Sequence, residues 1–326
     1  SGLGDTVEKR KVRGGLFLKK VRVPLGVLAV IYEARPEVTL DVAALCVKSG
    51  NASILKGGTE ALDTNTALYG CIEAALKKAK LPKHAVTFIA SGERSVTNEL
   101  LTRHDIVDLL IARGGYGMVK AVMERSTIPV LAHAAGGARI YVDQSADLSM
   151  AERIIVNAKI TKPAACNTVD TVLVHTRVAK AFIPSLVTAL KKEHVEVIGD
   201  TESKKFAKIG QATEKDWDTE FLSLKIGMKI VDSVHEAIAF TNRHTKRHTE
   251  GIVAKNKHVI DTFLRSVDAA ALFVNASTRF HDGFEFGLGS EMGIATGKIH
   301  ARGPVGLKEL TTYKWEVFGH GNIRTK

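Results

Sequence analysis

Cys166 is the residue whose surroundings in this sequence best suit covalent chemistry. It lies in a predicted loop after Pro163 and two alanines, at the junction of two halves of the chain, and Asn167 follows it directly. A thiolate nucleophile needs a reachable loop position in a cleft, with amide donors nearby to hold a developing oxyanion. A buried structural thiol would fit the same residues, so the pattern alone leaves both interpretations open.

The other two cysteines, Cys46 and Cys71, fall on the apolar faces of predicted helices, and we expect both to be small core residues. An odd count of three without paired spacing argues against a disulfide framework and favours a reducing compartment. The sequence has no Cys-x-x-Cys pattern, and no His-x-x-x-His spacing offers a metal site, so we predict none.

Two glycine turns could hold part of a nucleotide. Lys56-Gly57-Gly58 and Arg113-Gly114-Gly115 each follow a predicted strand and place a cation beside backbone that lacks a Cβ. Such turns suit a phosphate or a ribose, although each could equally be an ordinary turn. The commoner phosphate-binding sequences, Gly-x-Gly-x-x-Gly and the Walker loop, are absent.

Composition indicates a folded protein with room for two domains, since 45% of its 326 residues are hydrophobic and 25% are charged. The net charge of +11 favours anionic partners, among them nucleic acid, anionic membranes and small phosphorylated ligands. The densest basic cluster, at 8–13, has no interleaved aromatics and no nucleic-acid motif, so we expect no nucleic-acid partner. No apolar run could span a bilayer and no signal peptide is evident, which predicts a cytoplasmic protein without membrane contact.

Short β-branched runs alternate with amphipathic helical stretches along the chain. This rhythm predicts an α/β fold with a doubly wound, mostly parallel sheet, whose ligands bind beyond the carboxyl ends of the strands. Strands are predicted at 27–31, 53–55, 86–89, 106–111, 130–132, 139–142, 172–174, 229–231, 252–254 and 272–274. Helices are predicted at 40–47, 66–80, 96–102, 118–123, 150–160, 179–192, 234–242 and 260–266. Two alternating segments, 16–23 and 311–318, indicate exposed β-ribbon that needs a partner along its edges.

Several sequence blocks, in order along the chain, resemble the gamma-glutamyl phosphate reductase family of the aldehyde dehydrogenase superfamily. They lie at 22–27, 32–36, 48–51, 56–61, 162–167, 248–250, 286–294 and 301–314. The same family forms the C-terminal half of the bifunctional pyrroline-carboxylate synthase, so the chain could be a piece of either.

The resemblance implies an aldehyde-dehydrogenase-like fold of three parts. These are an oligomerisation β-arm at 1–24 and 303–326, an NADPH-binding domain at 25–157 and a catalytic domain at 158–302. In the arm, 13–24 would pair with 310–324. Family members carry further helices before the 22–27 block, whereas only 1–11 and a short ribbon precede it here, so we expect those helices of the cofactor domain to be missing.

The resemblance also implies a reaction, the NADPH-dependent reduction of L-glutamyl 5-phosphate to L-glutamate 5-semialdehyde with release of phosphate, in proline biosynthesis. Cys166 would attack the acyl phosphate to form a thioester, which hydride then reduces. The Asn167 side chain or the Cys166 backbone N–H would hold the oxyanion. Hydrolytic members of the superfamily carry a Glu base just before a Gly-Gly pair, but the matching stretch here is His133-Ala134-Ala135-Gly136-Gly137. The missing base fits a reductase that keeps water from its thioester.

Cofactor contacts carried over from the resemblance are Lys56 at the adenosine ribose, Glu220 at the nicotinamide ribose and the turn at Arg113 near the pyrophosphate. By chemistry, Arg35 and Arg279 suit the glutamyl carboxylate or the leaving phosphate, and salt bridges within the protein remain open for both.

His281 and Asp282 fall near the same site without an assigned role. A homo-oligomer and functional coupling to glutamate 5-kinase are the partners expected beside the substrate.

Three other functions stay open. Another aldehyde-dehydrogenase-like acyl reductase or oxidising enzyme would turn over simple aldehydes in place of glutamyl phosphate. An N-terminally truncated, inactive member would act as an oligomerising or regulatory subunit, and Cys166→Ala would leave its binding unchanged. A nucleic-acid binder built on the basic face would retain DNA in a salt-sensitive way.

Overall fold

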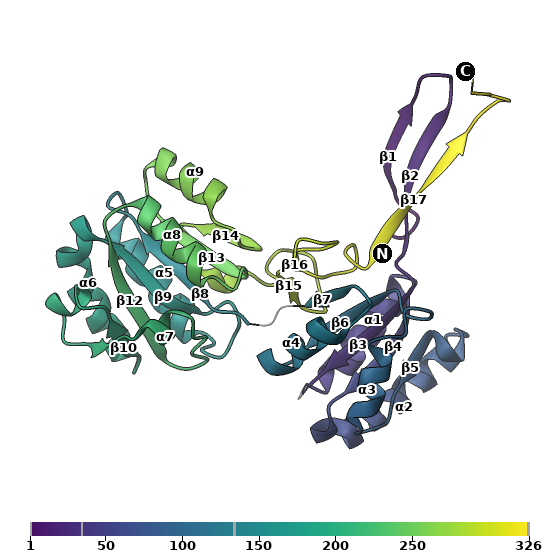
Figure 1. The fold of residues 1–326 in the computed structure, drawn as a ribbon, viewed down its shortest axis with the longest axis horizontal. Helices are drawn as coiled ribbons and strands as arrows, with labels where there is room; N and C mark the ends of the chain where they lie inside the picture. Colours follow the sequence, from purple (N-terminus) through teal and green to yellow (C-terminus); the bar gives the residue numbers. More distant parts are fainter. Residues whose placement is uncertain (1, 34, 133–134, 325–326) are drawn as a thin grey trace. The chain divides into compact units, whose positions relative to one another are not determined.

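The computed structural model describes residues 2–33, 35–132 and 135–324, and it contains two compact units (Figure 1). Unit 1 comprises Ser1–Ala132, Gly287–Ile294 and Ile299–Lys326, and unit 2 comprises His133–Phe286 and Ala295–Lys298. The division therefore follows Ala132, whereas the domain boundary expected at 157/158 lies inside a helix of unit 2. No helix within the described ranges combines the length and the apolar character needed to cross a membrane.

Unit 1 is built on a five-stranded parallel sheet with the order β5-β4-β3-β6-β7. Its strands are β3 (Val27–Tyr32), β4 (Ala52–Gly57), β5 (Val86–Phe88), β6 (Leu109–Arg113) and β7 (Val130–Ala132). The connecting helices are α1 (Glu37–Lys48), α2 (Leu62–Lys78), α3 (Arg94–Leu100) and α4 (Tyr116–Arg125), with short 3-10 turns at Thr59–Ala61 and Lys83–Ala85. Because β4 and β6 flank β3 on opposite sides, the strand order reverses there, as the predicted doubly wound pattern requires.

Helix α2 corrects one expectation about the cysteines. Cys46 is fully buried in α1, as predicted, and burial raises the pKa of its thiol to about 12. Cys71 is exposed, because α2 turns Ile72 and Leu76 toward the core and thereby places the preceding residue on its outer side. The prediction that Cys71 is a core residue is therefore wrong.

A separate three-stranded antiparallel sheet contains β1 (Thr6–Lys11), β2 (Phe17–Pro24) and β17 (Thr311–Phe318), in the order β1-β2-β17 (Figure 1). The pairing of β2 with β17 runs from Pro24 opposite Thr311 to Phe17 opposite Phe318, which matches the two ribbons predicted from the sequence. Strand β1 was not predicted. Cations lie over aromatic rings on this sheet, with Lys20 Nζ 3.5 Å from the ring centre of Tyr313.

Unit 2 is built on a seven-stranded parallel sheet with the order β11-β10-β12-β9-β8-β13-β14. Its strands are β8 (Ala138–Val142), β9 (Val169–His175), β10 (Glu196–Gly199), β11 (Gly210–Gln211), β12 (Lys225–Val231), β13 (Thr249–Val253) and β14 (Ala271–Val274). Its helices are α5 (Leu148–Ile160), α6 (Thr176–Lys192), α7 (Glu214–Trp217), α8 (Val234–His244) and α9 (Lys257–Ser266), with 3-10 turns at Ser203–Lys205 and Thr278–Phe280. Two short strands, β15 (Ile294–Ala295) and β16 (Gly303–Pro304), pair with each other.

Both faces of the sheet in unit 2 are covered. Ile140 and Val142 of β8 join one apolar cluster with α5 and α6, whereas Tyr141 between them joins a second cluster with α8 and α9. The continuous apolar runs of these strands follow from burial on both faces, as in other parallel sheets. Charged residues in these strands are therefore exceptions that need a partner, and Arg139, Asp170 and Glu250 are three of them.

Candidate functional site

In unit 1 the predicted cofactor residues meet at the carboxyl end of the sheet. Gly57 of β4 and Arg113 of β6 both lie opposite Tyr32 of the central strand β3. The Lys56 side chain is only 5% exposed, and its Nζ donates to the Gly57 carbonyl at 3.0 Å. Burial lowers the pKa of Lys56, and the charge of Glu60 opposes that shift. A buried amine and a glycine backbone at this edge suit the hydroxyls of a ribose.

The glycines of these turns allow close packing. A Cβ on Gly57 would collide with the Asn65 amide and lie 3.3 Å from Cε2 of Tyr32. At the start of α4, the backbone N–H of Gly115 donates to the Glu33 carboxylate at 2.9 Å, so a protein anion already occupies this helix N-terminus. Arg35, two residues beyond Glu33, is exposed.

In unit 2, Cys166 lies on the loop between α5 and β9, is partly exposed and forms no disulfide. The loop that precedes β8 packs directly against it. The Gly137 N–H donates to the Cys166 carbonyl at 2.6 Å, and a Cβ on Gly136 would lie 2.6 Å from both Cα and Cβ of Cys166. The backbone and Cβ of Cys166 are thus packed against a neighbouring glycine pair.

Asn167 joins the same loop to a third segment. Its side chain is 4% exposed, and its Nδ2 donates to the carbonyls of His281 at 3.0 Å and Arg279 at 3.4 Å. Arg279 is partly buried, and its Nε has no hydrogen-bond partner among residues 2–33, 35–132 and 135–324. A guanidinium whose Nε lacks a partner among these residues, on a residue whose carbonyl contacts Asn167, suits an anionic ligand. The ring of His281 contacts the hydroxyl of Thr249 at 2.7 Å, which anchors the far side of this segment.

Glu220 lies beside the same glycine pair. Its carboxylate accepts a hydrogen bond from the backbone of Gly136, the residue that packs on Cys166. Burial raises the pKa of Glu220, the Gly136 N–H lowers it, and the charge of Asp170 raises it again. One glycine therefore touches both the predicted nucleophile and the predicted ribose ligand.

The structure thus gathers Cys166, Asn167, Arg279 and Glu220 within unit 2, and Lys56–Gly58, Arg113–Gly115 and Arg35 within unit 1. The residues predicted to bind ligands lie at carboxyl ends of strands in unit 1, but not in unit 2. There the cysteine loop, the glycine pair and the Glu220 segment all precede their strands, at the amino ends of β9, β8 and β12. His133 and Ala134, which belong to the stretch matched to the missing base, lie outside the described residues.

Sequence reasoning missed two buried ion pairs next to this site. Arg139 of β8 pairs with Glu250 of β13 at 3.2 Å, and Lys159 of α5 pairs with Asp170 of β9 at 3.2 Å. All four side chains are at most 5% exposed. The signal was present, because a charged residue at the start of an otherwise apolar strand is rare unless it is paired.

Comparison with known proteins gives concordant matches. The model of the aldehyde dehydrogenase family matches residues 4–216 of this chain. Gamma-glutamyl phosphate reductase of Dictyoglomus thermophilum is 48% identical over 323 residues, which cover 99% of this chain and 78% of the relative. The enzyme of that name from Clostridium botulinum (strain Alaska E43 / Type E3) is 45% identical over 323 residues, with the same coverage of both chains.

Among solved structures, the crystal structure of gamma-glutamyl phosphate reductase from Thermotoga maritima matches with a TM-score of 0.97 and 42% sequence identity. The match covers 99% of this chain and 78% of that one. Sequence and fold therefore point to the same group of proteins over almost the whole chain.

Proposed function

The chain belongs to the gamma-glutamyl phosphate reductase family, oxidoreductases of proline biosynthesis within the aldehyde dehydrogenase family, and from that premise we propose its reaction. It reduces L-glutamyl 5-phosphate to L-glutamate 5-semialdehyde and releases phosphate, with NADPH as the reductant. The observation that carries the proposal is the contact of Gly136 with both Cys166 and Glu220. This contact brings a nucleophile and a ribose ligand together in unit 2.

The Cys166 thiolate attacks the acyl carbonyl of the substrate. A carbon–sulfur bond forms, the bond between carbon and the phosphate oxygen breaks, and phosphate leaves with that electron pair. The oxyanion formed on the way is held by the backbone N–H of Cys166, because Nδ2 of Asn167 already donates to the carbonyls of His281 and Arg279. Asn167 then serves to hold the nucleophile loop in place. Reduction of the thioester returns the aldehyde and the free thiol.

NADPH supplies the hydride when it is bound. Glu220 would hold the nicotinamide ribose, and Lys56 with the Gly57-Gly58 turn would hold the adenosine ribose. The buried Lys56 amine and the Cβ-free backbone beside it fit such a group. The turn at Arg113 would contact the pyrophosphate, where Gly115 now donates to Glu33, so binding there requires this carboxylate to release the donor.

Arg279 is the best candidate for the anionic groups of the substrate. Its buried Nε has no partner within the described part of the chain, and its backbone is tied to Asn167 beside the nucleophile. We assign it to the leaving phosphate or the glutamyl carboxylate. Exposed Arg35 is proposed as a second, outer anion ligand.

We also propose that unit 1 carries the cofactor and unit 2 the chemistry, and that the sheet of β1, β2 and β17 joins copies of the chain. Tyr313, Trp315 and Val317 alternate along β17 and are exposed, as an interface strand requires. Because an acyl phosphate is a reactive product, functional coupling to the glutamate 5-kinase that makes it is part of the proposal.

The reverse reaction tests the proposal. Glutamate semialdehyde, phosphate and NADP are supplied, and NADPH formation is followed for the wild type, Cys166→Ala and Cys71→Ala. Cys166→Ala should lose the activity and Cys71→Ala, an exposed thiol in the same chain, should retain it. Equal rates for Cys166→Ala and the wild type would refute the mechanism.

A further inference from the structure

Two buried charged residues lie on either side of the segment that carries Glu220, and both contact its backbone. We propose that Arg139 and Asp170 are positioning residues, which hold segment 217–221 at its two ends so that Glu220 faces the cofactor beside Cys166. The inference deepens the proposed function and rests on the cofactor role assigned there to Glu220.

Arg139 holds the first end. One guanidinium nitrogen donates to the Trp217 carbonyl at 3.1 Å and to the His244 carbonyl, and the other donates to Glu250 at 3.2 Å. Glu250 is fully buried and also accepts from the backbone N–H of Arg139 at 2.7 Å and from Thr245 at 2.5 Å. The guanidinium is therefore locked in orientation, and its fixed fork sets the position of the Trp217 carbonyl.

Asp170 holds the second end. Its carboxylate accepts a hydrogen bond from the backbone N–H of Phe221, the residue after Glu220, and Lys159 pairs with it at 3.2 Å. Asp170 is also the extra residue of a β-bulge, since Ala138 pairs with Val169 while the next residue pairs with Thr171. A bulge re-aims a side chain and is common beside active sites.

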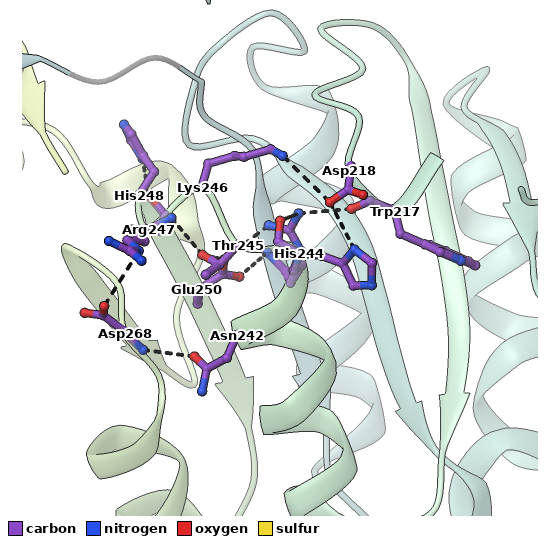
Figure 2. Close-up of polar contacts among 12 residues, drawn as sticks. Trp217, Asp218, Asn242, His244, Thr245, Lys246, Arg247, His248, Glu250 and Asp268 are labelled. Atoms are coloured by element: carbon purple, nitrogen blue, oxygen red, sulfur yellow. Dashed lines mark hydrogen bonds and ion pairs between the residues drawn. The ribbon is translucent and has the colours of Figure 1, made fainter. Parts of the chain in front are cut away.

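A third contact holds the middle of the segment from outside. Asp218 accepts from His244 Nδ1 at 3.0 Å and lies 3.8 Å from Nζ of Lys246, as Figure 2 shows. Burial alone would raise the pKa of Asp218, but the hydrogen bond and charge of His244 lower it. Because this side chain is 54% exposed, it can be removed without leaving a buried charge.

Energetics favour a positional role for the two buried pairs. Desolvation of four charged groups costs as much as their attraction returns, so well-packed apolar residues would stabilise the sheet equally well. Arg139 lies on β8 and Asp170 on β9, yet both side chains form hydrogen bonds with the backbone of one short segment. Fixed supporting contacts of this kind are what a binding residue on a loop needs.

The test compares three variants with the full-length wild type: Asp218→Ala, Arg139→Lys, and the matched control Asp268→Ala. Asp268 likewise pairs with two cations, Arg247 at 3.8 Å and Lys298 at 3.0 Å, and it lies apart from Trp217 and Asp218 in Figure 2. Lysine at 139 keeps the charge opposite Glu250 but cannot reach the carbonyls in the same fork. The Kd of NADPH is measured by its fluorescence, together with the KM of each substrate and the Tm.

We expect Asp218→Ala and Arg139→Lys to raise the Kd of NADPH about tenfold, to leave the KM of the semialdehyde unchanged, and to lose their effect in a Glu220→Gln background. Asp268→Ala should match the wild type. If Glu220→Gln weakens NADPH binding but neither Arg139→Lys nor Asp218→Ala does, the positioning role is overturned while the proposed function stands. If Glu220→Gln itself has no effect, both the cofactor role of Glu220 and this inference are overturned. Should Arg139→Lys unfold, the half-exposed Asp218 decides alone.

Discussion

Substitution of Gly136 by alanine should lower the reaction rate strongly while unit 2 remains folded. The added methyl group would lie 2.6 Å from Cα and Cβ of Cys166, and closer still to its carbonyl oxygen. Ordinary contact begins near 3.4 Å, so the two loops must part by about 0.8 Å to relieve the contacts with Cα and Cβ, and by more to relieve the contact with the carbonyl oxygen. These three atoms are two backbone atoms and Cβ of Cys166, so no flexible side chain can move away instead.

A displacement of that size is large for a reacting atom. Misplacement of a reacting group by about 1 Å costs about 100-fold in rate, which is about 3 kcal/mol of barrier. Overpacking of this kind costs about 1–3 kcal/mol of folding stability, so the protein should remain folded with a lower Tm. Because the Gly136 N–H also holds Glu220, the KM of NADP should rise together with the fall in kcat.

The assay is NADP reduction with glutamate semialdehyde and phosphate, with the Tm measured on the same samples. Gly70→Ala is the control, because Gly70 lies in α2 and a Cβ there would meet nothing within 4 Å. That variant should keep the wild-type rate and gain slightly in stability, since alanine favours a helix. A Gly136→Ala protein with both the wild-type Tm and the wild-type rate would refute the reasoning.

Two further predictions concern buried ionisable groups. Lys56→Met should raise the Kd and KM of NADPH with kcat little changed, because contacts to the adenosine ribose are made equally in the ground and transition states; an unchanged Kd would remove Lys56 from the cofactor site. Burial raises the pKa of Glu250 to about 7 against the opposing effect of Arg139, so the folded state keeps a proton that the unfolded state releases near pH 4.5. The stability that this group contributes is therefore complete below pH 4.5 and is lost as the pH rises to 7, by about 3 kcal/mol. Urea unfolding of the wild type and Glu250→Gln between pH 5 and 8 should show this slope in their difference, and a flat difference would contradict it.

Local sequence patterns predicted most of the strands, because both parallel sheets are buried on two faces and their strands are therefore apolar runs. Runs such as 27–31 and 172–174 are apolar without alternation, and they form central strands in the structure. The position of Cys71 shows the limit of such patterns. Neighbouring helical residues differ by about 100° around the axis, so the choice between Cys71 and Ile72 as the inward residue depends on tertiary packing.

The residues proposed for function also differ in whether the local sequence predicts them. Cys166 and Lys56 stand out by residue type and local context, and glycine turns are visible in any sequence. Arg139 and Asp170 contact the backbone of a segment far away in the chain, and the bulge at Asp170 exists only once β9 pairs with β8. The register between β8 and β9 depends on pairing between residues far apart in the sequence, so a local pattern cannot predict it.

The carboxylates around Cys166 bear on how a thioester could survive in water. A general base needs a lone pair that can reach a water molecule. Glu220 accepts a hydrogen bond from the Gly136 N–H, and Asp170 accepts one from Phe221 and pairs with Lys159. Glu250 is buried and pairs with the guanidinium of Arg139. Asp170 and Glu250 are each paired with a buried cation, and the acceptor sites left on Glu220 are the ones proposed for the nicotinamide ribose. With alanine in the sequence at the place that the resemblance matches to the hydrolytic base, the proposed mechanism leaves these carboxylates no free role in hydrolysis, and hydride transfer would then be the faster fate of the proposed thioester.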